Sequence, residues 1–221
     1  MATSGVHTFT MDVSDICEEA YERCGIEMRS GYDARGARRS LNLLLLEMGN
    51  HQVNLWKSLP FTLPLVAGQA SYELETKVMD VNSLAFRKVG TTDISIARLN
   101  RDEYMDRPNK STTSQRSTQY YFERTVPPRL YVWPVPDNNN CTIVGYAMEQ
   151  IESVTEATET VDIPQRFVPA VIAGLAYYIA LKRVPEKAQM LKTVYDEEIT
   201  RAEFEDRERV SFRAIPSVPR I

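Results

Sequence analysis

The middle of this chain contains an apolar, strand-like run, RLYVWPVPD at residues 129–137, which ends at Pro134 and Pro136. Proline lacks the N–H group that a sheet ladder uses, so the two prolines predict a strand end at a sheet edge that is protected from unwanted pairing. Trp133, just before them, is expected to anchor a core or an interface. Because segments with helical periodicity lie on both sides of this region, the pattern predicts a β region inserted into a helical frame.

Seven short runs rich in aromatic and β-branched residues predict the strands of the inserted region. They cover residues 61–66, 70–74, 81–87, 94–99, 119–124, 130–133 and 142–148. Gly68-Gln69 predicts a hairpin between the first two runs, and residues 137–140 predict another between the last two. Asn100 suits the cap of a helical turn, after which residues 108–118 are expected to form a polar, mobile loop. The set indicates an antiparallel β-sandwich or small barrel.

Apolar residues at three- and four-residue spacing predict four helices. They are expected over residues 13–24, 33–48, 164–183 and 186–209, the third starting at Pro164 and the fourth following Pro185. Asp12 and Gly25 suit the two ends of the first helix. In the second helix, Leu43 and Leu46 widen the apolar stripe, so we expect this helix to be covered on two sides, by its own fold or by a neighbouring subunit.

Two of the predicted helices differ in charge. The second carries Arg35, Arg38 and Arg39 in its first half, whereas residues 186–209 hold eight acids against five bases. The acidic helix is either a solvated face with internal ion pairs or a surface that meets the arginines of the second helix on a neighbouring subunit. Residue chemistry alone leaves both readings open.

The composition restricts the classes of function that fit. With 43% hydrophobic and 25% charged residues, the 221-residue chain has the profile of a globular protein. Its net charge of −4 argues against nucleic acid as the main ligand. Its apolar runs are too short or too interrupted to span a bilayer and no leader-like segment opens the sequence, so we expect a soluble protein with no membrane partner.

Three cysteines without CxxC spacing predict neither a disulfide framework nor a zinc site. Cys17 and Cys24, two helical turns apart, are expected to be small core residues. The sequence also lacks the GxxxxGK[ST], GxGxxG, GxSxG and HExxH motifs. We therefore expect no enzyme activity, no catalytic residue, no cofactor and no metal.

Two ligand-binding alternatives remain for the β region. A metal-dependent nuclease could use Asp137 and Glu149, although no lysine follows nearby to complete such a site. Aromatic side chains on two predicted strands could stack the bases of a single-stranded nucleic acid. Packing in the core explains more simply those aromatic residues that alternate along a strand. These aromatic residues are Tyr120, Tyr121, Phe122, Tyr131 and Trp133.

The last residues, 211–221, interleave apolar side chains with two prolines. The residues concerned are Phe212, Ile215, Pro216, Val218, Pro219 and Ile221. Such a segment cannot form a regular helix, and it exposes apolar side chains if it is free. It is therefore either a frayed terminus or a tail that docks onto a partner.

Several segments, in this order, resemble the head-to-tail adaptor proteins of short-tailed bacteriophages. They are RSLNLLLLEMGNHQVNLW, GQASYEL, ISIARLNRDEYMDRPNKST, QYYFER, RLYVWPVPD and DIPQRFVPAVIAGLAYYIALK, and the resemblance runs from about residue 14 to residue 209. It implies an α+β fold in which both ends of the chain form a helical bundle around an inserted β domain. The expected domains are residues 1–57 and 161–210 for the bundle, 58–160 for the β domain and 211–221 for a docking tail.

The resemblance further implies a component of the virion neck or tail that is assembled in the host cytoplasm. Such an adaptor forms a ring with itself, a dodecamer, beneath the portal protein, extends the DNA channel and offers a platform for the tail nozzle, with DNA only as passing cargo. Another neck or minor virion protein, such as a stopper, is the structural alternative. We expect Arg35, Arg38 and Arg39 to pair with acids of neighbouring subunits and the tail to reach the portal. Loops of the β domain, especially residues 108–118, are expected to meet the nozzle or surrounding tail proteins.

Overall fold

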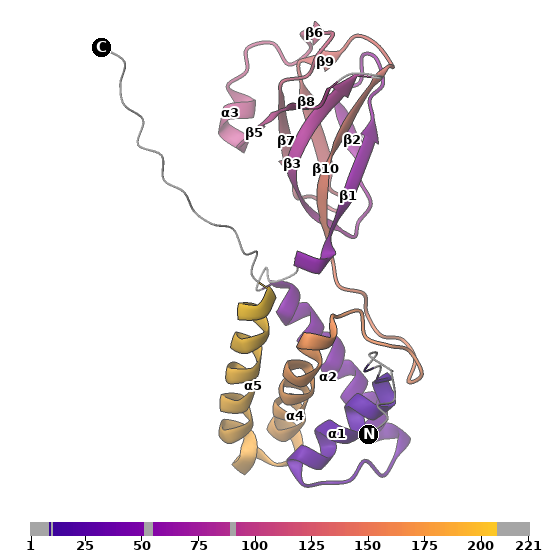
Figure 1. The fold of residues 1–221 in the computed structure, drawn as a ribbon, viewed down its shortest axis with the longest axis vertical. Helices are drawn as coiled ribbons and strands as arrows, with labels where there is room; N and C mark the ends of the chain where they lie inside the picture. Colours follow the sequence, from indigo (N-terminus) through magenta and orange to yellow (C-terminus); the bar gives the residue numbers. More distant parts are fainter. Residues whose placement is uncertain (1–8, 10, 51–54, 89–91, 207–221) are drawn as a thin grey trace, which may run out of the picture. The chain divides into compact units, whose positions relative to one another are not determined.

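The computed structural model describes residues 9, 11–50, 55–88 and 92–206, and these form helices and sheets in an α+β fold (Figure 1). The predicted fold class is confirmed. The chain divides into two compact units, one formed by Met1–Leu45 with Val154–Ile221 and the other by Leu46–Ser153. We call them the helical unit and the β unit and describe each by itself.

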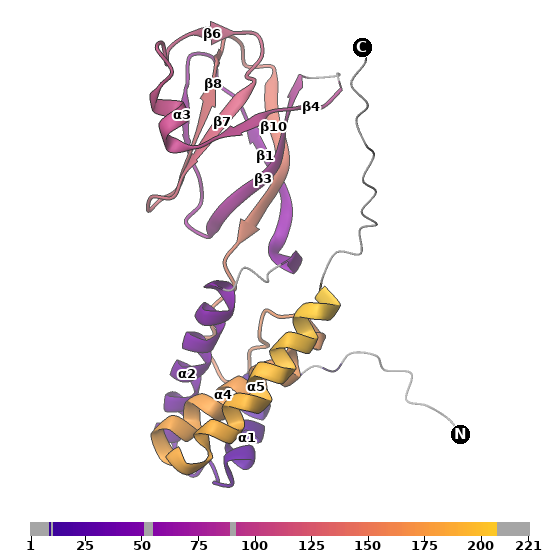
Figure 2. The same cartoon turned by 90° about the vertical axis from the view of Figure 1, so that its left-hand side faces the viewer.

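The helical unit is built from four long helices and one short 3₁₀ turn (Figure 2). They are α1 (Val13–Cys24), α2 (Gly31–Asn50, whose last turn belongs to the β unit), η2 (Gln165–Phe167), α4 (Val168–Arg183) and α5 (Pro185–Asp206). Helix α4 is the central one, because its side chains are buried along most of its length and it packs against both α1 and α5.

Helix α1 has the predicted ends. The Asp12 side chain accepts a hydrogen bond from the Asp15 backbone N–H, 2.8 Å away, and caps the first turn. At the other end, Gly25 adopts a left-handed conformation with φ of 73° and donates its N–H to the Glu22 carbonyl. Cys17 and Cys24 are buried, as predicted, and all three cysteines are free thiols.

Helix α2 extends two residues beyond the predicted range at each end. Its predicted apolar face is buried at Ala37, Leu41, Leu44, Leu45 and Met48. The two leucines that widen the stripe are not covered: Leu43 is 54% exposed and Leu46 is 49% exposed. Among the described residues, the fold of one chain therefore covers only one side of this helix.

Small residues let the other helices approach α4 closely. A Cβ atom added at Gly174 would lie 2.8 Å from a methyl carbon of Leu44 on α2 and 2.9 Å from a ring carbon of Tyr195 on α5. Gly174 is therefore the point at which side chains from two neighbouring helices meet the α4 backbone.

Two details of the C-terminal helices differ from the prediction. Pro164 is the N-cap of η2, with an extended backbone, and α4 begins only at Val168 with Pro169 in its first turn. The extended conformation suits proline just outside a helix, and Pro169 takes the position within the first turn where a missing N–H costs nothing. Helix α5 begins at Pro185 and is described to Asp206, so the predicted residues 207–209 lie outside the described residues.

The β unit consists of two four-stranded sheets and a two-stranded ribbon (Figure 1). Its strands are β1 (Ser58–Pro64), β2 (Ser71–Glu73), β3 (Val78–Lys88), β4 (Ile94–Ser95), β5 (Ala97–Leu99), β6 (Thr113–Ser114), β7 (Gln119–Glu123), β8 (Arg129–Trp133), β9 (Val135–Pro136) and β10 (Cys141–Glu149). One 3₁₀ turn, η1 (Leu55–Lys57), precedes them, and helix α3 (Arg101–Met105) follows β5. The strand order is β1-β10-β3-β4 in the first sheet and β2-β8-β7-β5 in the second.

The two sheets pack face to face around one apolar core. Alternate residues of each strand point into it, such as Tyr120 and Phe122 from β7 and Leu130 and Val132 from β8. The arrangement is a sandwich, and no closed barrel forms among the described strands. The strand pairs are antiparallel except for β5 with β7 and β6 with β9, which pair in parallel.

Both predicted hairpins are also wrong. Strand β1 pairs with β10 while β2 pairs with β8, so the turn at Gly68 carries the chain from one sheet to the other. The Tyr72 hydroxyl holds this turn, because it accepts a hydrogen bond from the Val66 N–H at 2.9 Å. In the same way, residues 137–140 connect β9 of the two-stranded ribbon to β10 of the first sheet. Local turn signals are the same for a hairpin and for a crossing between sheets, which explains both errors.

One predicted strand, residues 94–99, is divided between the two sheets. Strand β4 pairs with β3 in the first sheet, and β5 pairs with β7 in the second. Ile96, between them, is buried in the shared core. The run therefore changes sheets at Ile96, a buried residue between two strands whose other residues, apart from Leu99, are exposed.

Strand β8 ends at Trp133, just before Pro134, as predicted, but Pro136 does not exclude pairing. Pro136 lies in β9, which pairs with β6, and the N–H groups that donate in this ladder belong to Val135 and Asp137 on either side of it. The missing N–H of Pro136 therefore falls where the parallel ladder needs no donor. The predicted loop over 108–118 is thus held in part by strand pairing.

Helix α3 confirms the predicted helical turn. The Asn100 side chain accepts from the Glu103 N–H and the Glu103 side chain accepts from the Asn100 N–H, both at 2.8 Å. This reciprocal capping box satisfies two backbone donors at the start of a helix that is too short to be stable alone.

Candidate functional site

A hollow of the helical unit that carries both charged and apolar side chains lies between α2 and the end of α4. It has a volume of about 560 Å³, and we call it the α2–α4 recess. Its lining includes Tyr32, Asp33, Arg39, Leu43, Lys182 and Arg183. Tyr32 is 64% exposed, and within the part of the chain that the structure describes Arg39 forms no ion pair. The recess thus presents cationic and apolar groups to the outside.

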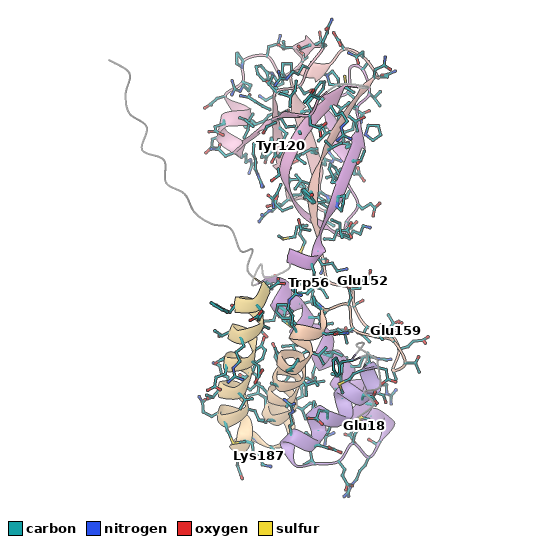
Figure 3. The ribbon with its side chains drawn as sticks, viewed as in Figure 1. Glu18, Trp56, Tyr120, Glu152, Glu159 and Lys187 are labelled. Carbon is teal, nitrogen blue, oxygen red and sulfur yellow. The ribbon has the colours of Figure 1, made fainter. Side chains whose placement is uncertain are left out.

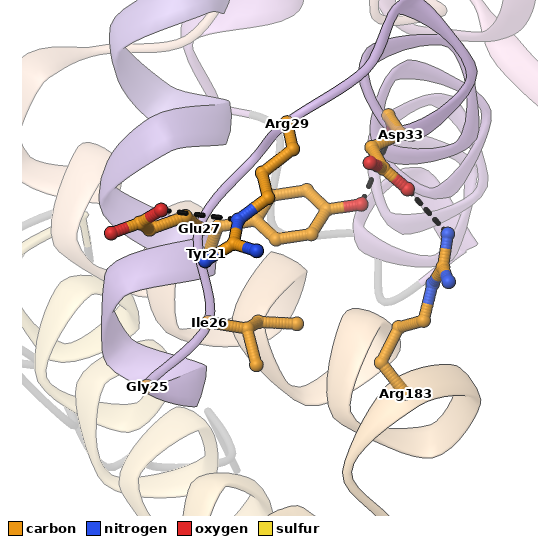
Figure 4. A pocket seen from close by; sticks show the side chains of 7 residues that line it. All are labelled: Tyr21, Gly25, Ile26, Glu27, Arg29, Asp33 and Arg183. Carbon is orange, nitrogen blue, oxygen red and sulfur yellow. Dashed lines mark hydrogen bonds and ion pairs between the residues drawn. The ribbon is translucent and has the colours of Figure 1, made fainter.

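Asp33 on α2 and Arg183 on α4 both line the recess, and they form the ion pair that is drawn in Figure 4. Arg183 donates to the carboxylate of Asp33, and the Ser30 hydroxyl donates to the same carboxylate at 2.8 Å. The Ser30 hydrogen bond, with the nearby Arg183 charge, lowers the pKa of Asp33. Asp33 is therefore ionised at neutral pH and neutralises Arg183.

A second hollow of about 500 Å³ is lined by the same ion pair (Figure 4). Tyr21, Asp33 and Arg183 line both hollows. The Tyr21 hydroxyl donates to the backbone carbonyl of Asp33 at 3.3 Å, and burial raises the pKa of this tyrosine. Arg29 pairs with Glu27 at its rim, so this second hollow has balanced charge.

The positive charge of the recess comes from Arg39 and Lys182. Lys182 donates from Nζ to the Ser40 hydroxyl at 2.6 Å, a contact that fixes its position without neutralising its charge. Because Arg183 is paired with Asp33, the two other cations leave an excess of positive charge next to the exposed side chain of Leu43. This combination suits an acidic partner surface with apolar side chains.

The three arginines predicted as interface residues differ in their contacts. Arg38 donates from Nη1 to the backbone carbonyl of Thr155, so it holds a loop of its own unit. Arg35 is exposed and donates to the carbonyl of Gly31 within the same helix at 3.2 Å. Only Arg39 lines the recess. The structure therefore brings one of the three arginines into the candidate site.

The other predicted interface residues lie in the tail and fall outside the described residues. They are Phe212, Ile215, Pro216, Val218, Pro219 and Ile221. Sequence reasoning missed Tyr32, Asp33, Lys182 and Arg183. Exposed apolar residues on α2 were the available signal, but the pairing of Asp33 with a residue 150 positions later has no local signature.

The outer face of α5 has the opposite charge to the recess. The helix carries seven acids against three bases, and its exposed charged side chains are four acids and two bases. Lys187, labelled in Figure 3, donates from Nζ to the Cys24 carbonyl at the end of α1, and Arg201 pairs with Glu198 at 2.7 Å. Three large apolar side chains are exposed on the same helix: Met190, Val194 and Phe204. The outer face of α5 is thus acidic and partly apolar.

In the β unit, the charged groups serve the fold. The carboxylate of Asp80 on β3 accepts from Arg98 on β5 and from Arg124 after β7, both at 2.8 Å. Burial acts to raise the pKa of Asp80, but the hydrogen bonds from the two arginines outweigh it and the pKa is lowered. Asp80 therefore joins the first sheet to the second.

The aromatic residues considered for base stacking already have partners. Tyr120 and Phe122 are in the core. Tyr121 and Tyr131 stack against each other and against Tyr104 of α3, with ring centroids 5.2 to 5.7 Å apart. Contacts within the unit thus account for these four aromatic rings.

Trp133 has polar contacts of its own. It donates from Nε1 to the Asn109 carbonyl at 3.0 Å, and the Arg107 guanidinium lies 4.9 Å from its ring centre. Through these contacts Trp133 anchors the beginning of the loop over 108–118. The side chain is half-buried rather than a core residue.

The acids proposed for a nuclease do not come together as a metal cage. Glu149 pairs with Lys77 at 3.3 Å, and Asp137 accepts from the Asn138 amide at 2.6 Å. Among the described residues, no group of three or more His, Cys, Asp or Glu side chains could hold a metal ion. Within the same ranges, the helices are all too short or too polar to cross a membrane.

The exposed apolar and charged side chains gathered on the helical unit are typical of a surface that binds other proteins. The chain matches the sequence model of the SU10 adaptor protein over residues 11–217. It belongs to the SU10 adaptor protein family and is a structural adaptor protein of a bacteriophage, which confirms the resemblance found in the sequence. A search among curated proteins finds no match.

Proposed function

We propose that the chain is the head-to-tail adaptor of its virion and that its copies form a ring, a dodecamer, beneath the portal. The ring extends the DNA channel and offers the attachment platform for the tail nozzle. The observation that carries this proposal is family membership, because the match covers residues 11–217 and therefore both units. The α+β architecture, with its helical unit built from both ends of the chain, is consistent with it.

The charges and exposed apolar groups of the helical unit support self-assembly. A ring requires each copy to carry two different surfaces that fit each other. The α2–α4 recess is cationic and the outer face of α5 is acidic, and both carry exposed apolar side chains. The net charge of −4 also suits a DNA conduit, since like charges keep the phosphates from adhering to its wall.

Particular segments are assigned to particular partners. Arg39 pairs with acids of a neighbouring copy, while Arg35 contributes at the edge of that contact and Arg38 supports the Thr155 loop. The apolar residues of the tail over 211–221 reach toward the portal protein. The loop over 108–118, anchored through Trp133 and Asn109, meets the nozzle or another tail protein.

The mass of the native assembly tests this function. Native mass spectrometry of the full-length chain, alone and mixed with the portal protein of the same phage, is expected to show a ring of twelve copies on the portal. A variant lacking residues 211–221 is expected to keep the fold, as judged by its circular dichroism, and to lose attachment to the portal. If the full-length chain stays monomeric and unattached in both samples, the adaptor function is wrong.

A further inference from the structure

We propose that α5 of one copy of this chain docks into the α2–α4 recess of the next copy. The contact is head-to-tail, because each copy contributes a different helix on its two sides. This inference rests on the proposed function, which requires the copies to associate. It goes further because it names the two surfaces, the residues at their centre and the charge difference that determines which surface meets which.

The recess offers a stripe along α2 with a notch in its middle. Tyr32, Gly36, Arg39 and Leu43 recur at helical spacing on its open side. A Cβ atom added at Gly36 would have no atom within 4 Å, so the helix surface is open at this point. Glycine inside a helix costs about 1 kcal/mol relative to alanine, and a close approach by another helix explains its presence.

The outer face of α5 carries a matching stripe. Met190, Val194, Glu197 and Arg201 are exposed and have the same spacing as the four residues of α2, and Phe204 continues the row. At a rise of about 1.5 Å per residue, each row of four spans about 17 Å. An apolar side chain of the α5 row, such as Val194, is of the size that the Gly36 notch accepts.

Charge selects the occupant of the recess. The recess has Arg39 and Lys182 without a carboxylate partner among the described residues, whereas the exposed charged side chains of α5 are four acids and two bases. Recess against recess would bring cations together, and α5 against α5 would bring acids together. The favourable combination is recess against α5, and a contact between two different surfaces can repeat until a ring closes.

Single cysteines test which surfaces meet. In the full-length chain, Leu43→Cys and Val194→Cys are made separately and the two proteins are mixed, with the portal protein present and absent, under mild oxidation. The three native cysteines are buried, so the added thiols are the reactive ones. We expect cross-linked dimers from the mixture at least tenfold more abundant than from either variant alone. A chain that carries both substitutions is expected to give a ladder of multimers.

The outcomes separate this inference from the proposed function. If a ring forms and the mixture gives no dimers, or if Leu43→Cys alone gives as many dimers as the mixture, the assigned surfaces are wrong and the adaptor function stands. If neither the native chain nor the variants associate with each other or with the portal, both proposals are wrong.

A second variant excludes simple loss of folding. Gly36→Leu adds a side chain where the structure has open space, so the isolated chain should unfold at the same urea concentration or a higher one. The same change should raise the protein concentration needed for half-assembly at least tenfold, because the notch is filled. Glu18→Leu, at an exposed site on α1 (Figure 3), is the matched control and should leave assembly unchanged. Normal assembly of Gly36→Leu would overturn the docking mode.

Discussion

Asn42 and Val154 are joined by two hydrogen bonds of 2.9 Å. The Asn42 side chain donates from Nδ2 to the Val154 carbonyl and accepts from the Val154 N–H, although the two residues are 112 positions apart. The amide thus pairs with a backbone group as a neighbouring strand would. Since Val154 begins the return of the chain into the helical unit, this contact fixes where that return joins α2.

Asn42→Ala should lower the free energy of unfolding by about 1–3 kcal/mol, because it leaves a part-buried backbone N–H and carbonyl without partners. Urea unfolding followed by circular dichroism measures the change. Gln189→Ala, an amide on the exposed face of α5, is the matched control and should change stability by less than about 0.5 kcal/mol. Equal effects of the two substitutions would contradict the role of Asn42.

Two glycines inside helices should respond to alanine with opposite signs. Gly174→Ala places a methyl group against Leu44 and Tyr195 in a filled core, and we expect a net loss of about 1 kcal/mol after the gain in helix propensity. Gly36→Ala meets open space and should stabilise the chain by about 0.5–1 kcal/mol. The melting temperatures of the two variants, compared with that of the native chain, test these opposite signs. A higher melting temperature for Gly174→Ala would show that Leu44 and Tyr195 are not closely packed against α4.

Asp80 should make the stability of the chain depend on acid pH. Its folded pKa is below the ordinary value of 3.8, so its contribution is fully present above that value and is lost as the pH falls through the folded pKa. Asp80→Asn should cost about 1–3 kcal/mol at pH 7, and this difference from the native chain should shrink as the pH falls below about 3.8.

An exposed arginine–aspartate pair provides the control for Asp80. Asp93 pairs with Arg87 at the surface, so Asp93→Asn should leave unfolding by urea nearly unchanged at pH 7 and at pH 2.5. If the difference in the free energy of unfolding between the native chain and Asp80→Asn stayed constant down to pH 2.5, Arg98 and Arg124 would not act through the charge of Asp80.

The native thiols should be inert in the folded chain. Burial raises the pKa of Cys17 to about 11, and burial also raises the pKa of Cys24. Because the thiolate is the reactive form, a thiol reagent such as DTNB at pH 8 should label the native protein at least a hundredfold more slowly than the urea-unfolded chain, in which all three cysteines react. Rapid labelling of one thiol in the native state would contradict the burial of these residues.

Local patterns predicted the helices and most strands well. Asp12, Gly25 and Asn100 end or begin their helices because capping depends on residues within one turn. Tyr120, Phe122, Leu130 and Val132 mark the buried faces of β7 and β8, because the two-residue alternation of a strand is also a local pattern. The sequence predicted only part of the candidate site. It indicated the three arginines together with Leu43 and Leu46, but it did not indicate that Arg38 binds the Thr155 carbonyl while Arg39 lines the recess.

The sequence by itself determined that this protein is an α+β adaptor, with helices at both ends and strands between, because periodicity, caps and ordered motifs are local properties of the chain. Only the tertiary structure decided that Gly68 and residues 94–99 cross between sheets, that Pro136 pairs, and that Arg39 rather than Arg38 lines the recess. Each of these features depends on which surfaces, far apart in the sequence, pack against each other and exclude water. A pattern within a few residues does not encode that packing.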